Sequence, residues 1–339
     1  MPHILEAGDL NAEMLDEVFV EADHYSEILA QPAGSDDRRG VAETLSGSVV
    51  TLMFLSDSTR TMKSFKSAAL RLGAGVDEVQ GRFVAGDDGV DRLHITGSST
   101  GKGESYEDTL RMYGAYSDAL VLRSPKEGAA HEAARICGGI AIANGGDGSG
   151  HHPTQAALDL YTIRQRFGRL DNLKIMLGND LRYSRVAHSL IELLTQYEGN
   201  EFILASTKGL SIPDEVRHHL LETETKFTEV ENPYPHLSTV DIAYWMRSQR
   251  ERWPQPALAC NTIQLDRGKM KELGPHAVAM HALPMTPDEV GQFVPGHPQF
   301  IAYEQAANGV PVRMALLRYM LSAQVRVEPV HAFTELQVA

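Results

Sequence analysis

The segment FLSDSTRTMKSF, residues 54–65, joins an apolar run to an amphipathic one through a turn rich in hydroxyl groups and charge. The run that precedes it, SVVTLMFL, is apolar and β-branched, which predicts a buried strand ending at Leu55. After the turn, Phe65 and Leu72 lie at helical spacing, and Gly73 predicts the end of the helix. The segment therefore predicts a strand, a polar turn and a helix, which is the repeating unit of an α/β fold.

The polar turn allows two interpretations. A helix N-terminus presents unpaired backbone N–H groups and the positive end of the helix dipole, so it can bind an anion. Ser58, Thr59 and Thr61 can donate through their hydroxyls, and Arg60 can contact a phosphate with two hydrogen bonds. The alternative is an ordinary capped helix start with surface hydroxyls. The turn taken alone leaves both open.

The same alternation continues along the chain. DALVLRSP and GIAIANGG predict strands, and Pro153 begins a helix that ends at Gly168. NLKIMLGND, EFILAS and DIAYWMRSQ predict further strands, with SRVAHSLIELLTQY as a helix between the first two. We therefore expect two α/β domains with mainly parallel sheets joined by helices. A last apolar helix, near residues 312–321, is expected to fold back onto the first domain.

Residues 73–104 are rich in Gly, Asp, Ser and Thr and show little periodicity, which predicts a long mobile loop. Its end, GSSTGKGES, resembles a nucleotide phosphate loop, but the spacing between the glycines is one residue short. Gly103 also occupies the place of the hydroxyl that would bind magnesium. Nucleotide binding is therefore disfavoured. Lys102 is interpreted either as a cation that reaches a phosphate or as a solvated lysine.

Polar residues follow several of the predicted strands. Arg123 ends one strand, His152 precedes the helix at Pro153, and Arg185 and Arg247 follow later strands. In parallel sheets the ligand crevice lies at the carboxyl ends of the strands, so these side chains are expected to converge. Each one alone is equally well explained as a surface residue or, for His152, as a helix cap.

The composition bounds the classes of function. A formal charge of −14 argues against a surface that binds nucleic acid, and no apolar run reaches the roughly 18 residues of a membrane span. Cys137 and Cys260 have no metal-ligand spacing and suit a reducing cytosol. The acidic, amphipathic N-terminus is unlike a signal peptide. A soluble cytoplasmic protein is expected, with no metal or other cofactor, because the common metal and serine-nucleophile motifs are missing from the sequence.

The order of the motifs resembles the aspartate and ornithine carbamoyltransferase family, and most closely its aspartate branch. FLSDSTRTMKSFKSAALRLGAGV resembles the family's carbamoyl phosphate motif, Ser-x-Arg-Thr. GDGSGHHPTQAALDLYTI, GRLDNLKIMLGNDLRYSRVAHSL, DIAYWMRSQRERW and EQAANGVPVRMALL resemble its later segments, in consistent order from about residue 45 to 325. HALPM stands where the family has His-Pro-Leu-Pro-Arg.

The resemblance implies roles for particular side chains. The groups implied to bind carbamoyl phosphate are Ser58, Thr59, Arg60, Thr61, Ser98, Lys102, Arg123, His152, Gln155 and the main-chain carbonyls at Ala282 and Leu283. Among these, Thr61, Arg123 and His152 would surround the carbonyl oxygen, while Gln155 and the two carbonyls would accept the carbamoyl NH2 group. The groups implied to bind aspartate are Lys102, Arg185, Arg247, Gln249 and Leu283. Arg60, Thr61, Arg123, His152 and Gln155 would form the catalytic set.

The resemblance also implies an organisation. Residues 1–152 with 305–339 would form the domain that binds carbamoyl phosphate, and residues 153–304 the domain that binds aspartate. Ser98 and Lys102 would reach into the site of a neighbouring subunit in a homotrimer, and regulatory or other partner chains are compatible with the family. The implied reaction gives N-carbamoyl-L-aspartate and phosphate, a step of pyrimidine biosynthesis, without a covalent enzyme intermediate.

Four residues depart from the family pattern: Met62 replaces an Arg, Lys66 a Glu, Ala282 a Pro and Met285 an Arg. Met62 and Lys66 are expected behind the polar turn, where they would alter an internal ion pair, and Ala282 and Met285 are expected closer to the chemistry. The Leu283–Pro284 bond is expected to be cis. Two other functions stay open: a transcarbamoylase for a different amine, of dicarboxylate type, and a non-catalytic paralogue. The ornithine branch is disfavoured because its His-Cys-Leu-Pro string is HALP here.

Overall fold

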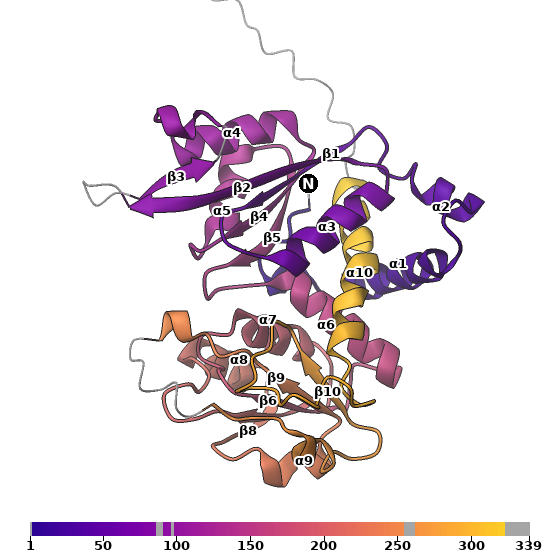
Figure 1. Ribbon diagram of the computed structural model, residues 1–339, viewed down its shortest axis with the longest axis vertical. Helices are drawn as coiled ribbons and strands as arrows, with labels where there is room; N and C mark the ends of the chain where they lie inside the picture. The colour runs from indigo at the N-terminus through magenta and orange to yellow at the C-terminus, as the bar shows by residue number, and fades with distance from the viewer. Residues whose placement is uncertain (1, 86–90, 96–97, 254–261, 323–339) are drawn as a thin grey trace, which may run out of the picture.

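The computed structural model describes residues 2–85, 91–95, 98–253 and 262–322, and contains two five-stranded sheets that lie one above the other (Figure 1). Nine strands pair in parallel within these sheets, and only β3 in the described residues runs antiparallel to its neighbour. The predicted fold class, two α/β domains with mainly parallel sheets, is therefore confirmed. Residues 323–339 and Cys260, which the predictions included, lie outside the described residues.

The first sheet has the strand order β3-β2-β1-β4-β5. Its strands are β1 (Val49–Phe54), β2 (Gly75–Ala85), β3 (Asp91–Ile95), β4 (Ala119–Ser124) and β5 (Ala141–Asp147). The strands β1, β4 and β5 are apolar and almost fully buried, as expected of parallel strands covered on both faces. Their carboxyl ends point to the same edge of the sheet, which faces the second sheet.

The second sheet has the order β10-β9-β6-β7-β8. Its strands are β6 (Lys174–Gly178), β7 (Glu201–Ala205), β8 (Lys226–Val230), β9 (Ile242–Trp245) and β10 (Val278–His281). The buried strands β6, β9 and β10 lie side by side, so the loops that follow them leave the sheet together. In open α/β sheets this is where ligands bind.

Helices pack on both faces of the sheets. They are α1 (Ala12–Ala30), α2 (Asp36–Val41), α3 (Thr59–Arg71), α4 (Tyr106–Tyr116), α5 (Ala129–Cys137), α6 (Pro153–Phe167), α7 (Arg185–Leu194), α8 (Asp214–Glu222), α9 (Arg267–Met270) and α10 (Ala302–Ser322), with short 3₁₀ turns at Ala7–Asp9, Ser99–Lys102, Tyr234–Thr239 and Arg250–Arg252. None of the described helices is long and apolar enough to cross a membrane.

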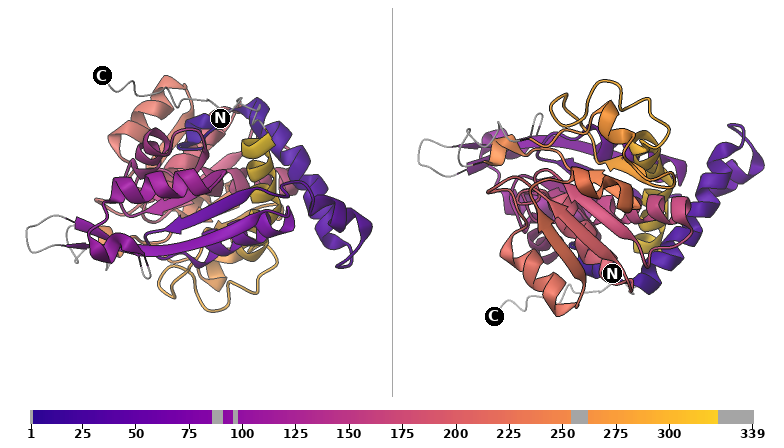
Figure 2. Two further views of the ribbon diagram at one scale, coloured as in Figure 1. Left: turned by 90° about the horizontal axis from the view of Figure 1, so that it is seen from above. Right: turned by 90° about the horizontal axis from the view of Figure 1, so that it is seen from below.

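The helix α6 leaves the first sheet and leads into the second, and α10 returns from the second to pack against α1 and α3 (Figures 1 and 2). Buried residues of α1, α3, α6, α7 and α10 form one apolar cluster with residues of both sheets. A second cluster fills the outer face of the second sheet, and a third lies under α4 and α5. The shared cluster holds the facing strand ends of the two sheets in fixed relative positions, and these strand ends form the site described below.

Most of the predicted elements are confirmed, including β1, α3, β4, β5, α6, β6, α7, β7 and β9. The mobile loop predicted for residues 73–104 is wrong in the described part, where β2 and β3 form an antiparallel pair. The polar sequence of β2 is typical of a strand near the edge of a sheet with one face in solvent. Its residues 79–84 alternate between exposed and at least partly buried positions. The last helix begins at Ala302, earlier than the predicted start near residue 312, and Pro311 lies within it.

Gly73 allows a test of how tightly α3 is connected to β2. Its φ is +86°, and a Cβ built on it would lie 1.8 Å from the Ala42 carbonyl oxygen. Gly34 has φ +88° with nothing within 4 Å of such a Cβ, so it is a matched control. The G34A variant is expected to lose about 1–2 kcal/mol of unfolding free energy from the left-handed backbone alone. The G73A variant should lose a further ~1–3 kcal/mol in urea titrations, because the backbone must move; equal losses would contradict this packing.

Candidate functional site

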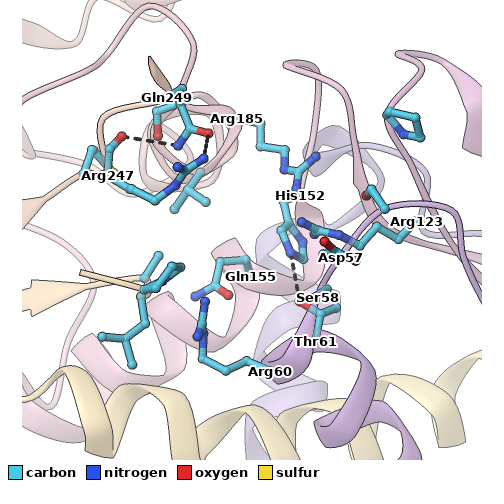
Figure 3. Close-up of a pocket in the computed structure, with 18 of the residues that line it drawn as sticks. Asp57, Ser58, Arg60, Thr61, Arg123, His152, Gln155, Arg185, Arg247 and Gln249 are labelled. Carbon is cyan, nitrogen blue, oxygen red and sulfur yellow. Dashed lines mark hydrogen bonds between the residues drawn. The ribbon is translucent and has the colours of Figure 1, made fainter. Parts of the chain in front are cut away.

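A cavity of about 580 Å³ lies between the carboxyl ends of the two sheets. Its walls follow β1, β4 and β5 of the first sheet and β6, β9 and β10 of the second. Eleven of the fourteen predicted site residues line it: Ser58, Arg60, Thr61, Arg123, His152, Gln155, Arg185, Arg247, Gln249, Ala282 and Leu283. The expected convergence of strand-end polar side chains is therefore what the structure contains (Figure 3).

Three predicted residues do not line the cavity. Thr59 is exposed on the first turn of α3. Ser98 begins the 3₁₀ turn after β3, where its hydroxyl donates to the Ile95 carbonyl at 2.9 Å, and Lys102 is exposed at the end of that turn. Neither Ser98 nor Lys102 contributes to the cavity of its own chain.

The floor of the cavity is the start of α3. Ser58 occupies the N-cap position, yet within the described residues its side chain makes no capping hydrogen bond. The first-turn N–H groups thus have no side-chain cap from Ser58, unlike those of α1, which Asn11 caps at 2.8 Å. Arg60 and Thr61, in the first turn of α3, line the cavity. This geometry favours the anion-binding interpretation of the turn over the simple cap.

The electrostatics of the cavity are strongly positive. Five arginines line it, against two carboxylates: Arg60, Arg123, Arg185, Arg247 and Arg252 against Asp57 and Glu251. Burial, and then the neighbouring Arg252 and Arg60, lower the pKa of Arg123 to about 10. Burial and Arg123 also hold the pKa of Arg185 well below its usual range. These cations repel one another, so an anion that binds among them relieves this repulsion.

Gly146, at the end of β5, lets two of these arginines meet. Its φ is +110°, and a Cβ there would lie 2.8 Å from the Arg185 guanidinium carbon and 2.9 Å from Arg123 Nη1. The guanidinium groups instead donate to backbone carbonyls, Arg123 to Gly145 at 3.1 Å and Arg185 to Gly148 at 2.9 Å. These bonds aim an arginine from the first domain and one from the second at the same space.

His152 lies at the centre of the cavity, directly before α6. Its backbone N–H donates to Ser189 Oγ at 3.0 Å, and its Nε2 lies 3.4 Å from Thr61 Oγ1 (Figure 3). Its Nδ1 is buried and has no hydrogen-bond partner among the described residues. Burial, followed by the charges of Arg185 and Arg123, holds the pKa of His152 well below its usual range. The imidazole is therefore neutral at neutral pH and can donate one hydrogen bond without adding charge.

The far wall of the cavity is the loop after β9. Arg247 donates to Gln249 Oε1 at 2.6 Å and to Glu251 Oε2 at 3.2 Å. Buried carboxylates hold this loop: Asp180 accepts from the Gln249 N–H at 2.9 Å and from Trp253 Nε1 at 2.7 Å, and Glu289 accepts from the Ser248 N–H at 2.8 Å. Arg247 and Gln249 thus stand opposite Arg60 across the cavity (Figure 3).

The third wall is the segment after β10. The Leu283–Pro284 peptide bond is cis, as predicted. Ala282 and Leu283 line the cavity, whereas Met285 packs against the outer core of the second sheet and does not. Met285 was expected close to the chemistry, but its side chain packs against that core instead.

Met62 and Lys66 lie on α3 and do not line the cavity, as expected. Met62 is buried, and Gln80 donates to its sulfur at 3.5 Å. Lys66 pairs with Glu78 of β2, which also accepts from Lys63 at 3.2 Å. The lysine that replaces the family's glutamate thus has a carboxylate partner on the neighbouring strand.

Sequence reasoning missed several residues of the site, namely Asp57, Gly146, Glu251, Arg252 and Pro284. Arg252 was the easiest of them to predict, since it follows the same strand as Arg247. Its guanidinium donates to the Tyr183 carbonyl at 2.9 Å. Gly146 gave no signal, because its importance lies in the two arginine side chains that approach it. Within the described residues, no group of three or more His, Cys, Asp or Glu side chains could hold a metal ion.

Comparisons with known proteins give matches along almost the whole chain. Residues 2–165 match the family model described as aspartate/ornithine carbamoyltransferase, carbamoyl-P binding domain, and residues 171–320 match the Asp/Orn binding domain of the same family. The aspartate carbamoyltransferase catalytic subunit of Methanospirillum hungatei is 38% identical, with 94% of this chain and 98% of that protein covered. The one from Hyperthermus butylicus is 39% identical, with 95% and 96% covered.

Solved structures are similar over almost the whole chain. The catalytic subunit of M. jannaschii aspartate transcarbamoylase superposes with a TM-score of 0.81 at 34% identity, covering 96% of this chain and 99% of that one. Aspartate transcarbamoylase from Trypanosoma cruzi in complex with carbamoyl phosphate gives a TM-score of 0.81 at 28% identity, covering 94% and 95%.

Proposed function

The chain belongs to the aspartate/ornithine carbamoyltransferase family, and we propose that it transfers the carbamoyl group of carbamoyl phosphate to the amine of L-aspartate. The products are N-carbamoyl-L-aspartate and phosphate, so the reaction serves pyrimidine biosynthesis. The observation that carries the proposal is the single cavity that combines an uncapped helix N-terminus with arginines at opposite walls. One anionic group fits at α3, and a second fits between Arg185 and Arg247.

At the floor of the cavity, the start of α3 holds the phosphate of carbamoyl phosphate through Ser58, Arg60, Thr61 and the backbone N–H of Thr59. The backbone N–H groups of a helix start and a guanidinium provide both the hydrogen bonds and the charge that a phosphate dianion needs. Arg123 lies between this anion and the centre of the cavity, so it contacts both the phosphate and the carbonyl oxygen. This position of Arg123 favours a donor whose carbonyl carbon carries a phosphate group, such as carbamoyl phosphate.

At the centre, Thr61, Arg123 and His152 donate to the carbonyl oxygen, while Gln155 and the carbonyls at Ala282 and Leu283 accept from the NH2 group. The neutral amine of aspartate attacks the carbonyl carbon and forms a tetrahedral intermediate whose oxygen carries a negative charge. The C–O bond to phosphate then breaks, and the departing phosphate accepts the amine proton. Donors placed at the developing charge lower the barrier, each typically by about 3 kcal/mol.

At the far wall, Arg185, Arg247 and Gln249 bind the two carboxylates of aspartate. Two guanidinium groups on separate elements, α7 and the loop after β9, match an amine that carries two carboxylates better than one that carries a second amine. Holding both substrates in one cavity makes the attack effectively intramolecular, which contributes a further part of the rate.

An assay for ureido products with carbamoyl phosphate and a panel of amines tests the function. Product formation with L-aspartate at a kcat/KM well above that with L-glutamate, L-ornithine and L-alanine is expected. Product with another dicarboxylate amine in preference to aspartate would identify the alternative transcarbamoylase. No product with any amine, from protein that binds carbamoyl phosphate, would identify a non-catalytic paralogue.

The proposal includes a division of the chain and an assembly. Residues 1–152 with 305–339 form the carbamoyl phosphate domain and residues 153–304 the aspartate domain; the packing of α10 against α1 and α3 supports this division. Three copies assemble so that Ser98 and Lys102 enter a neighbour's site, which supplies two of the three predicted residues that do not line the chain's own cavity. The protein acts in the cytoplasm, where the free, buried Cys137 would stay reduced.

The neutral state of His152 predicts how stability depends on pH. Because the pKa of His152 is lowered in the folded protein, below about pH 6.5 only the unfolded chain binds a proton there. The free energy of unfolding therefore falls as the pH falls through 6.5, and H152Q should remove this contribution. Between pH 6.5 and 5.5 the unmodified protein should lose about 1 kcal/mol more than H152Q in urea titrations. Equal losses would mean that His152 titrates normally in the fold.

A further inference from the structure

Asp159 is a buried acid that the proposed reaction does not use. It lies on α6, one helical turn after Gln155, and is fully buried. Its Oδ1 accepts hydrogen bonds from Gln155 Nε2 at 2.9 Å and from Gln305 Nε2 at 2.6 Å, and its Oδ2 accepts from Tyr244 OH at 2.8 Å. Three elements, α6, α10 and β9, therefore meet at one carboxylate.

The first consequence concerns the direction of the Gln155 amide. Oδ1 of Asp159 accepts hydrogen bonds from two amide groups, so Gln155 turns its NH2 group toward Asp159. The amide oxygen of Gln155 then points away from Asp159, on the side of the cavity that Gln155 lines. An oxygen presented there accepts a hydrogen bond from a ligand NH2 group. A reversed amide would instead place the Gln155 NH2 group against the ligand NH2 group, and two donors cannot form a hydrogen bond.

The second consequence concerns the segment after β10. Gln305 donates to Asp159 with its NH2 group and accepts from the backbone N–H of His281 with its oxygen, at 3.1 Å. His281 Nδ1 in turn accepts from the backbone N–H of Leu283 at 2.8 Å. A chain of hydrogen bonds thus connects the carboxylate to the segment whose carbonyls lie at the cavity wall.

Both arms of this network begin at the same carboxylate oxygen. Gln155, His281, Ala282 and Gln305 also line one small cavity beside the main one, together with Arg313. Burial raises the pKa of Asp159 to about 7, and its hydrogen bonds and the charge of Arg313 oppose this rise. The carboxylate is thus placed to control the only two kinds of acceptor that the proposed reaction assigns to the carbamoyl nitrogen: a side-chain amide oxygen and main-chain carbonyls.

We propose that Asp159 is a positioning residue that keeps the Gln155 oxygen and the carbonyls at Ala282 and Leu283 aimed at the donor's NH2 group. It thereby makes the site select a carbamoyl donor over an acyl donor of the same shape. The inference rests on the proposed function for the identity of the donor. It goes beyond that function because it assigns the selectivity to a residue that touches neither substrate.

Acetyl phosphate is the matched probe, because it has a methyl group where carbamoyl phosphate has NH2. Calorimetric titrations of the full chain give the dissociation constants of carbamoyl phosphate, acetyl phosphate and inorganic phosphate. The unmodified protein is expected to prefer carbamoyl phosphate over acetyl phosphate. In D159N, the new amide can donate to Gln155 and allow it to reverse, so this preference should shrink by about tenfold or more. The affinity for inorganic phosphate should change less than about twofold, since the phosphate contacts lie on α3.

T162V is the control variant. Thr162 is equally buried on α6, one turn beyond Asp159, and its hydroxyl accepts from Asn308 of α10 at 3.0 Å. It therefore links the same two helices without reaching the cavity, and its variant should keep the preference for carbamoyl phosphate. If D159N does not fold, Q305M, which removes only the arm toward His281, is expected to reduce the preference in the same direction.

The outcomes separate this inference from the proposed function. An unchanged preference in D159N or Q305M, or equal losses of affinity for all three ligands, would overturn the positioning role. An unmodified protein with no preference between carbamoyl and acetyl phosphate would also overturn it. Failure of the proposed function has a different signature: a preference for carbamoyl phosphate without ureido product from aspartate.

Discussion

The R123M variant is expected to lower kcat by about 10²–10³-fold. Arg123 extends from the end of β4 between the start of α3 and His152, where the carbonyl oxygen of the donor is proposed to lie. The charge on this oxygen grows in the transition state, so a preorganised guanidinium stabilises the transition state more than the bound substrate. Methionine keeps most of the buried stem and removes only the donors and the charge. Steady-state kinetics with saturating carbamoyl phosphate and aspartate measure the effect.

The stability of R123M should change in the opposite sense to its activity. In the free protein Arg123 is partly buried near other arginines; burial, and then these charges, lower its pKa to about 10. Removing one of several mutually repelling cations is therefore expected to leave the melting temperature of the free protein unchanged or raised. The control is K126M, three residues further on, where the lysine lies over the Phe83 ring outside the cavity. A kcat within twofold of normal in R123M, or an equal loss in K126M, would contradict the assignment.

The R247A variant is expected to raise the KM for aspartate by about 10–150-fold, which corresponds to the ~1.5–3 kcal/mol of a hydrogen bond to a charged group. Arg247 is already oriented by Gln249 and Glu251, so its guanidinium is in place before aspartate arrives. It lies across the cavity from α3, and the affinity for carbamoyl phosphate should therefore change little. Initial rates over a matrix of both substrate concentrations separate the two effects.

Arg250 gives the matched control for R247A. It lies on the same loop and carries the same charge, but it is exposed, pairs with Asp288 at 2.7 Å and does not line the cavity. R250A should keep the KM for aspartate within about twofold, as surface ion pairs contribute little. A larger effect of R247A on carbamoyl phosphate than on aspartate would reverse the roles of the two walls.

The part of the fold that could be predicted from the sequence is the part where periodicity and burial coincide. The strand β1 is apolar throughout and α3 has a clear apolar stripe, so both were recognisable from residues 48–73. The strand β2, which pairs with the edge strand β3, was not, because its sequence contains as many polar side chains as a loop. The first half of α10 was not predicted either, since the prediction rested on the apolar residues 312–321 alone.

The site shows the same division. The strand-end arginines and His152 could be predicted because parallel sheets bring all carboxyl ends of their strands to one edge. Gly146 and Asp159 could not, since each acts through side chains from other elements that only the folded chain brings to it. Ser98 and Lys102 show a further limit: their proposed role needs a second chain, so neither the sequence pattern nor the fold of one chain places them at a substrate.

The most direct test of the central claim is a crystal structure with N-(phosphonacetyl)-L-aspartate, which joins a phosphonate to the two carboxylates of aspartate. The phosphonate is expected on the first-turn N–H groups of α3 beside Arg60 and Arg123, with the carboxylates on Arg185 and Arg247. A ligand bound elsewhere, or bound with its phosphonate on Arg185 and Arg247 and its carboxylates on α3, would contradict the account.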